Sequence, residues 1–253
     1  MKKSRCLVQT LAVALATTWG VSQATASFDY NISGSTTYFL TGIAVSIDSI
    51  PESGFYCGGI QIGPSTASGA NGTVPGYANF TTVCVDLEGR IYTGQNYTFD
   101  KVPFSGQTGL NPHWGTPGTD TTAAYQGIEN AAWLFAHHNT VTTAEDWAAL
   151  QLAVWDVIYN TDVNGKVTGT RFSVTNPGSS GAWAEAQTWV SALSSGRTQD
   201  YVGYLLKPTD NTAQELFIGV TPVPEPTTII AGALLLLPFG ASTLRILRKN
   251  RTA

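Results

Sequence analysis

Two side chains in this sequence have types that could react with each other: the thiol of Cys84 and the carboxamide of Gln151. A cysteine thiolate is a nucleophile, and a glutamine carboxamide is an acyl group whose leaving group is ammonia. If the fold holds the Cys84 sulfur against the Gln151 carbonyl carbon, proximity can drive a reaction that is otherwise negligible. The product would be an internal thioester.

Gln151 lies in residues 144–160, whose pattern predicts an α-helix that Thr143 and Asp146 open as a capping box. Five positions of that helix share one arc by their spacing: Trp147, Gln151, Val154, Trp155 and Ile158. A carboxamide in such a stripe costs roughly a few kcal/mol unless its polar atoms find partners. Gln151 is therefore either a core glutamine bonded to nearby backbone or a reaction partner.

Cys84 lies in residues 80–87, which alternate as a β-strand does. Phe80, Thr82 and Cys84 share one face of this predicted strand. A thioester needs protection from water, and Phe80 with the tryptophans of residues 144–160 could provide it.

The remaining cysteines leave a second possibility open. Cys6 lies in a predicted signal peptide, so the mature chain keeps Cys57 and Cys84. Two cysteines in an exported protein are typical of one disulfide. The alternative prediction is therefore a Cys57–Cys84 disulfide.

The order of elements predicts an α+β domain. Strand-like segments lie within residues 27–50, 80–87, 97–102, 201–206 and 215–220, with a short strand possible at 59–62 in an otherwise loop-like stretch and a further strand at 91–92. Helical periods occupy residues 121–139, 144–160 and 182–193. We expect a β-barrel or sandwich with strands from both ends and a three-helix insertion.

Both ends of the chain have the pattern of targeting segments. Residues 1–26 combine Lys2, Lys3 and Arg5 with an apolar run and a small-residue cleavage pattern at residues 24–26, as in a signal peptide. Residues 227–244 are an apolar run that would span roughly 27 Å as a helix, enough to cross a bilayer. A basic tail follows it, which the positive-inside rule keeps cytoplasmic: Arg245, Arg248, Lys249 and Arg251.

The C-terminal segment, residues 221–253, resembles the PEP-CTERM sorting signal of exported bacterial proteins. The residues that carry the resemblance are Pro224, Glu225 and Pro226, followed by the apolar span and the basic tail. The resemblance implies a Gram-negative host and recognition by exosortase, a membrane-embedded protease. We expect an inner-membrane-anchored precursor that is then released to the cell surface or extracellular matrix.

Charge and motifs exclude several function classes. Seven of the 13 Lys and Arg residues lie in the two targeting segments, so the domain at residues 27–220 is strongly acidic and should repel nucleic acid. His137 and His138 are adjacent and His113 lies in a loop, so no helical metal pair forms. We expect no metal or cofactor. Carboxylate pairs of glycosidases are spatial, so the sequence leaves that class open.

The Cys84 and Gln151 segments resemble the thioester domains of bacterial surface adhesins. That family has an aromatic- or aliphatic-Cys-hydrophobic strand motif and a Thr-Gln-x-Ala-hydrophobic-Trp helix motif. Here the strand has Val83 before Cys84 and Val85 after it. The helix motif is Leu150, Gln151, Leu152, Ala153, Val154 and Trp155, with Leu150 where the family has threonine.

The resemblance implies that Cys84 is the thiol partner and Gln151 the acyl donor. An amine on a surface or matrix polymer would attack the Gln151 carbonyl, release the Cys84 thiol and leave an amide. Such a protein is a single-use anchor and not an enzyme. Tyr56, Cys57 and Gly58 are a weaker candidate for the strand motif. The alternative function is a non-reactive structural or carbohydrate-binding matrix protein with the Cys57–Cys84 disulfide.

Overall fold

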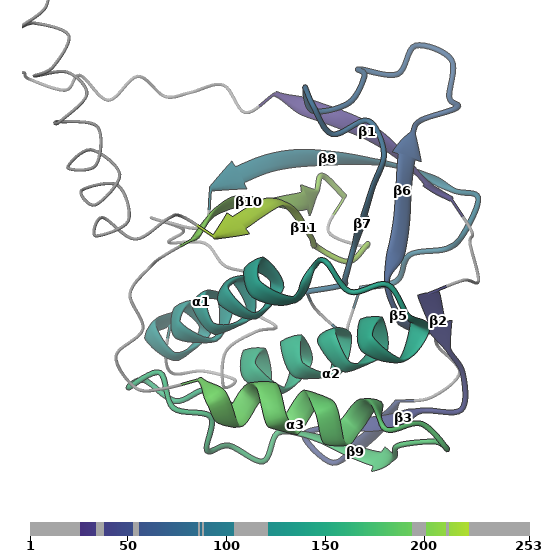
Figure 1. The fold of residues 1–253 in the computed structure, drawn as a ribbon. Helices are drawn as coiled ribbons and strands as arrows, with labels where there is room; N and C mark the ends of the chain where they lie inside the picture. Colours follow the sequence, from purple (N-terminus) through teal and green to yellow (C-terminus); the bar gives the residue numbers. More distant parts are fainter. Residues whose placement is uncertain are drawn as a thin grey trace, which may run out of the picture.

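The computed structural model describes residues 26–33, 38–52, 56–85, 87, 89–103, 121–193, 201–210 and 213–222. The predicted signal peptide up to residue 25 and the sorting signal from residue 223 lie outside the described residues, Pro224, Glu225, Pro226 and the basic tail included. Between its described ends the chain forms a mixed α/β domain with a large sheet and three helices (Figure 1).

The large sheet has six antiparallel strands in the order β11-β10-β8-β1-β6-β7. Their bounds are β1 Ser27–Ser33, β6 Ile60–Pro64, β7 Phe80–Thr82, β8 Asn96–Pro103, β10 Tyr201–Pro208 and β11 Leu216–Pro222. Strands that precede and follow the three helices in the chain are therefore neighbours, since β10 pairs with β8. The inner face carries the core, in which Tyr30, Phe99 and Phe217 are fully buried.

The two edges of this sheet meet at the cysteine. Cys84 lies two residues beyond β7 and pairs antiparallel with Leu216 of β11. On either side of that bridge, Val85 N–H donates to the Glu215 carbonyl at 2.8 Å and the Thr82 hydroxyl donates to the Phe217 carbonyl at 2.8 Å. These contacts bring the sheet close to a closed barrel and cover the backbone of both edge strands.

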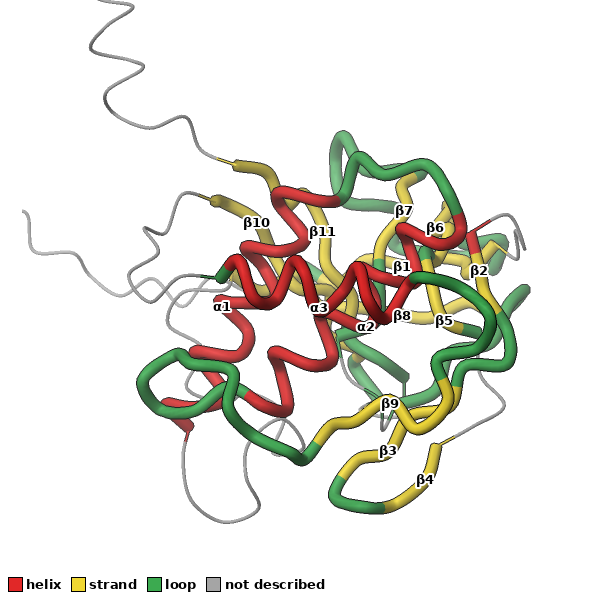
Figure 2. The backbone as a smooth tube through the Cα atoms, turned by 60° about the horizontal axis from the view of Figure 1, so that its bottom comes forward, coloured by secondary structure: helices red, strands yellow, loops and turns green. Residues whose placement is uncertain are grey.

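Two smaller sheets complete the β structure. Strands β2 (Phe39–Leu40) and β5 (Cys57–Gly58) form a pair. Strands β3 (Ala44–Ile47), β4 (Ile50–Glu52) and β9 (Phe172–Asn176) form a sheet with β3 in the middle. Figure 2 shows this three-stranded sheet to one side of the helices.

The helices are α1 (Thr121–His138), α2 (Ala144–Asn160) and α3 (Ala182–Ala192). Helix α2 packs between α1 and α3, and it also contacts β2, β5 and β9, whereas α1 packs on β10 and β11. Every residue from Trp147 to Asn160 is buried, so α2 is the central element of the domain. The Thr143 hydroxyl accepts from Asp146 N–H at 3.1 Å, which confirms the predicted start of this helix.

The structure confirms the predicted helices and a barrel-like sheet, and it corrects several strands. The strand predicted at residues 80–87 ends at Thr82, and Cys84 beyond it forms an isolated bridge with Leu216. Strand β9 was not predicted, and residues 91–92 are not a strand. Among the described residues no helix is both long and apolar enough to cross a membrane. The span predicted at residues 227–244 lies outside them.

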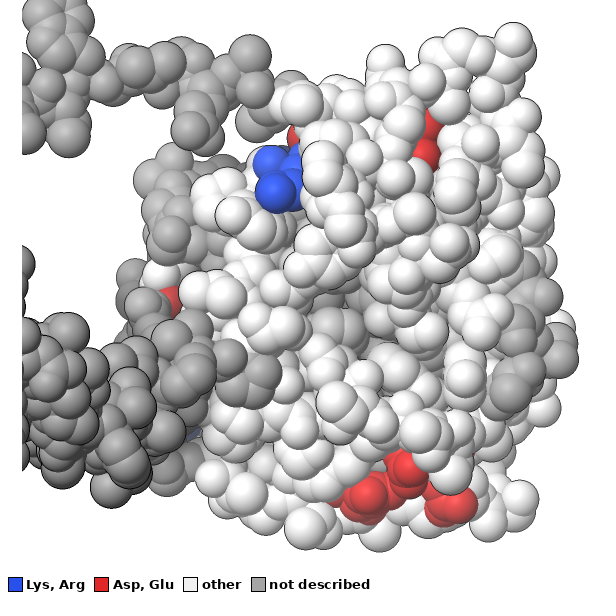
Figure 3. All heavy atoms as spheres, turned by 45° about the horizontal axis from the view of Figure 1, so that its top comes forward, with Lys and Arg blue, Asp and Glu red and all other residues white. Residues whose placement is uncertain are grey.

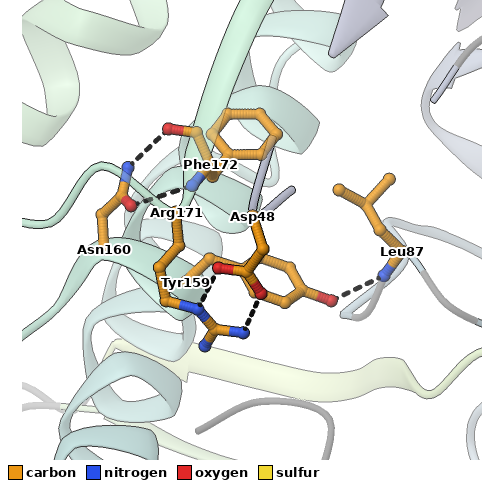
Figure 4. A network of polar contacts seen from close by, with 6 residues as sticks. All are labelled: Asp48, Leu87, Tyr159, Asn160, Arg171 and Phe172. Carbon is orange, nitrogen blue, oxygen red and sulfur yellow. Dashed lines mark hydrogen bonds and ion pairs between the residues drawn. The ribbon is translucent and has the colours of Figure 1, made fainter. Parts of the chain in front are cut away.

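A polar network ties the end of α2 to the cysteine segment and to the small sheet (Figure 4). Leu87 N–H donates to the Tyr159 hydroxyl at 3.0 Å. Arg171 lies over the Tyr159 ring, 5.6 Å from its centre, and binds Asp48 through two hydrogen bonds of 2.9 and 2.8 Å.

The hydrogen bonds from Arg171 lower the pKa of Asp48. The pair therefore stabilises the fold above the ordinary carboxyl pKa, and this contribution is lost as the pH falls through the lowered value.

One face of the domain carries few charges. Figure 3 shows one small cluster of Lys or Arg and a few Asp or Glu on a surface of otherwise uncharged side chains. The described residues of this face form no basic track of the kind that binds nucleic acid.

Asn160 offers a test of how the C-terminal end of α2 is held. Its carboxamide is buried and exchanges hydrogen bonds of 2.9 and 3.0 Å with the backbone of Phe172, and it also donates to Asp156 at 2.7 Å. Asn160→Ala removes these partners inside the protein, so we expect a loss of about 2–4 kcal/mol in the free energy of unfolding. Urea unfolding measures it. The matched control Asn164→Ala, at an exposed turn, should cost less than about 1 kcal/mol; equal losses would contradict this role.

Candidate functional site

The structure places Cys84 and Gln151 in direct contact. Cys84 N–H donates to Gln151 Oε1 at 2.8 Å, and Gln151 Nε2 donates to the Cys84 carbonyl at 2.7 Å. The two residues are 67 positions apart in the chain, and both are buried, with 5% of Cys84 and 1% of Gln151 exposed. Helix α2 and the segment after β7 therefore bring together the two residues that the sequence singled out.

This contact explains why a glutamine is tolerated on the buried helix. Both ends of its carboxamide are bonded to backbone, so the desolvation cost is offset. The structure thus confirms a core glutamine bonded to backbone, and the partner backbone is that of Cys84. Leu150, where the resembling family has threonine, is fully buried, and the carboxamide of Gln151 is oriented by Cys84.

The hydrogen bond to Gln151 Oε1 also has a chemical consequence. Attack on the Gln151 carbonyl carbon would place negative charge on Oε1, and Cys84 N–H already points at that atom. A backbone donor aimed at developing charge in a buried site is the arrangement found in oxyanion holes. The geometry therefore places a backbone donor at the oxygen of the Gln151 carboxamide.

The Cys84 sulfur has a further partner that the sequence analysis missed. The Cys84 thiol donates to Oε1 of Gln214, which is buried and lies two residues before β11. Gln214 meets Cys84 across the closed edges of the sheet, so local sequence patterns do not predict the contact. Its position directly before a predicted strand was the one available hint.

A cavity of about 360 Å³ lies beside Cys84. Cys84, Gln214 and Trp155 lie in its lining, and Arg90 forms an ion pair of 3.0 Å with Glu52, also in the lining. The other lining residues are largely apolar or aromatic: Ile32, Phe39, Tyr56, Ile60, Leu87, Gly89, Ile91, Tyr92 and Thr93. A small molecule or side chain in this cavity would meet Cys84.

Of the aromatic residues predicted to protect the site, the two tryptophans lie close to it. Trp155 lines the cavity, and Trp147 is buried on α2, one turn before Gln151. Gly59 provides the space for Trp147, since a Cβ there would lie 2.7 Å from the indole ring. Phe80 instead packs edge-on against Tyr30 and Tyr77.

His137 and His138 each stack on a tryptophan. His137 stacks on Trp133 and contacts the Trp133 carbonyl at 2.8 Å through Nδ1, and His138 stacks on Trp189. Burial, and to a smaller extent His137, lowers the pKa of His138. His113 lies outside the described residues, among which no three His, Cys, Asp or Glu side chains group as metal ligands.

A second depression lies away from the cysteine. It encloses about 700 Å³ between α2, α3 and β9, and Trp183, Asp156 and Gln187 line it. Gln187 Nε2 donates to the Asp156 carboxylate at 2.8 Å, and burial raises the pKa of Asp156. The depression therefore has an aromatic ring and polar groups on its wall.

No protein-family model matches this chain, and no curated protein matches it. Three solved structures are similar to it in fold. The first is the N-terminal thioester domain of a surface protein from Clostridium perfringens, with 10% sequence identity, a TM-score of 0.42 and coverage of 76% of this chain and 97% of that one. The second is the N-terminal thioester domain of the fibronectin-binding protein SfbI from Streptococcus pyogenes, with 9% identity, a TM-score of 0.37 and coverage of 77% of this chain and 98% of that one. The third is the N-terminal domain of the Streptococcus pyogenes pilus tip adhesin Cpa, with 10% identity, a TM-score of 0.35 and coverage of 77% of this chain and 99% of that one. At these values the likeness does not extend to the roles of individual residues.

The alternative disulfide is not formed in this structure. Cys57 and Cys84 are both buried, and neither is part of a disulfide. The Cys57 thiol points to the Ala148 carbonyl at 3.7 Å, on the side of α2, whereas the Cys84 thiol bonds to Gln214. The prediction of a Cys57–Cys84 disulfide is therefore wrong for this fold, because each sulfur faces a different partner.

Cys57 should behave as an inert thiol. It is fully buried, and burial raises its pKa well above the ordinary thiol value, so almost no thiolate forms. We expect iodoacetamide to leave Cys57 unmodified in the native protein and to alkylate it completely in denaturant without reductant. Peptide mass mapping measures both, with Cys57→Ala as the baseline. A peptide that joins Cys57 to Cys84 would overturn this placement.

Proposed function

We propose that this protein is an exported surface adhesin in which Cys84 and Gln151 form an internal thioester that reacts with amines on a surface or matrix partner. The observation that carries the proposal is the reciprocal pair of hydrogen bonds between Gln151 and the backbone of Cys84, at 2.8 and 2.7 Å. It holds an acyl group against the backbone of the residue that carries the nucleophile, in a buried site that adjoins a cavity.

The bond would form by loss of ammonia. The Cys84 sulfur attacks Cδ of Gln151, the C–N bond breaks, and Nε2 leaves as ammonia with the proton from the thiol. Cys84 N–H stabilises the charge that develops on Oε1. The neighbouring tryptophans limit the access of water, which would hydrolyse the thioester.

The thioester would then react with one partner molecule. A primary amine attacks Cδ, the C–S bond breaks, the amine proton passes to sulfur, and the partner remains attached through an amide. The protein would thus serve as a covalent anchor used once, and not as an enzyme. Its amine-bearing partner would be a polymer of a nearby surface or matrix.

The route to the surface follows from the two targeting segments. A signal peptide at residues 1–26 would direct export, and the sorting signal at residues 221–253 would hold a membrane-anchored precursor for an exosortase-type protease. This part of the proposal rests on the sequence alone. Release at the cell surface would bring the thioester domain to its partner.

The alternative function, a non-reactive carbohydrate-binding matrix protein, retains one supporting feature. The depression lined by Trp183 and Asp156 has the ring and polar groups that sugar binding uses. The Cys57–Cys84 disulfide that this alternative also predicted is absent from the structure. This alternative would be favoured if a polysaccharide in the gel slows the electrophoretic migration of the protein and if treatment with an amine leaves its intact mass unchanged.

Amine labelling tests the proposed function. We expect the purified protein to incorporate a biotin-tagged alkyl amine, and peptide mapping to place the tag at Gln151. Cys84→Ala should abolish labelling because no thioester can form, whereas the matched variant Cys57→Ala should label fully. Labelling of Cys84→Ala at the wild-type level, or a tag on Gln214, would contradict the assignment of Cys84 and Gln151 as the thioester residues.

A further inference from the structure

Two glutamines lie at Cys84, and the structure gives them different surroundings. Gln151 is held at both ends of its carboxamide by the Cys84 backbone. Gln214 contacts the sulfur itself, and together with Cys84 it lines the cavity of about 360 Å³. A molecule in the cavity therefore lies against Gln214 and Cys84.

We propose that Gln214 receives the attacking amine: its side-chain Oε1 accepts a hydrogen bond from the amine N–H and holds the nitrogen beside the Cys84–Gln151 bond. The inference rests on the proposed function and adds a residue that the sequence motifs do not contain.

The backbone around Gln214 is fixed from two sides. On one side, Leu216 pairs with Cys84 and the Glu215 carbonyl accepts from Val85 N–H at 2.8 Å. On the other, Gly89 packs so closely that a Cβ there would lie 2.6 Å from the Ala213 carbonyl oxygen and 2.7 Å from Gln214 N. The side chain of Gln214 therefore starts from a defined position, as a residue that orients a reactant must.

The chemistry changes the partner that Oε1 meets. In the free protein, Oε1 accepts the proton of the Cys84 thiol. Formation of the thioester removes that proton with the departing ammonia, so the sulfur no longer donates. An amine brings its own N–H donors, and one of them can take the place of the thiol proton at Oε1.

The same contact assists the step that follows. When the amine nitrogen attacks Cδ of Gln151, positive charge develops on the nitrogen, and its N–H bonds become stronger donors. The Gln214 carbonyl oxygen stabilises that charge without taking the proton, which passes to the Cys84 sulfur as the C–S bond breaks. A hydrogen bond that strengthens during the attack accelerates it.

The test compares two replacements of Gln214 in the exported full chain. Gln214→Met keeps the length of the side chain but removes the acceptor, and Gln214→Glu keeps an acceptor oxygen. We expect both variants to form the thioester, seen as an intact mass one ammonia below the sequence value. The second-order rate constant for reaction with n-butylamine should fall about tenfold in Gln214→Met and stay within about threefold of wild type in Gln214→Glu.

Gln61→Met is the matched control, since Gln61 lies on β6 outside the cavity lining. It should react at the wild-type rate, and thermal unfolding should show that all variants are folded. A Gln214→Met variant that forms the thioester and reacts as fast as wild type would overturn the inference. So would a folded Gln214→Met variant with no ammonia loss, because Gln214 would then act in forming the bond.

The mass and rate measurements distinguish failure of the thioester function from failure of the role of Gln214. If the wild-type protein shows no ammonia loss, the thioester function itself is wrong and the role of Gln214 falls with it. If the wild type carries the thioester but the rate is independent of the side chain at 214, only the role of Gln214 is wrong.

Discussion

The structure depends on one buried contact, the paired hydrogen bonds between the Gln151 carboxamide and the backbone of Cys84. The Cys84 segment closes the seam of the barrel-like sheet through Leu216, and Gln151 lies on the helix at the centre of the domain. A polar side chain here is costly unless it is fully bonded, so the helix and the seam must meet in one register. The contact thus joins the closing edge of the large sheet to helix α2.

The same contact also supports the proposed chemistry. The same bond that satisfies Gln151 Oε1 places a backbone donor where charge would develop during acyl transfer. The network of Tyr159, Arg171 and Asp48 ties the end of α2 to Leu87, just beyond the cysteine. Both partners are therefore held by rigid elements, which is the condition for a weak electrophile such as a carboxamide to react.

The sequence predicted the elements that local patterns determine. Helix α2 has the predicted bounds because its cap at Thr143 and its apolar period are local, and Cys84 and Gln151 were paired because their residue types are chemically complementary. Gln214 and strand β9 were missed, since both are defined by partners far away in the chain. The strand at residues 80–87 was predicted too long, because alternation shows which side chains share a face and not where pairing ends. Cys57 was paired with Cys84 on number and compartment alone, whereas the fold turns the two sulfurs toward different partners.

The most direct test of the central claim is the intact mass of the purified mature domain under non-reducing conditions. An internal Cys84–Gln151 thioester predicts a mass one ammonia below the sequence value, and a rise by the mass of one methylamine after treatment with that amine. The full sequence mass, unchanged by methylamine, would contradict the thioester and leave the Gln151–Cys84 contact as a structural hydrogen-bond pair.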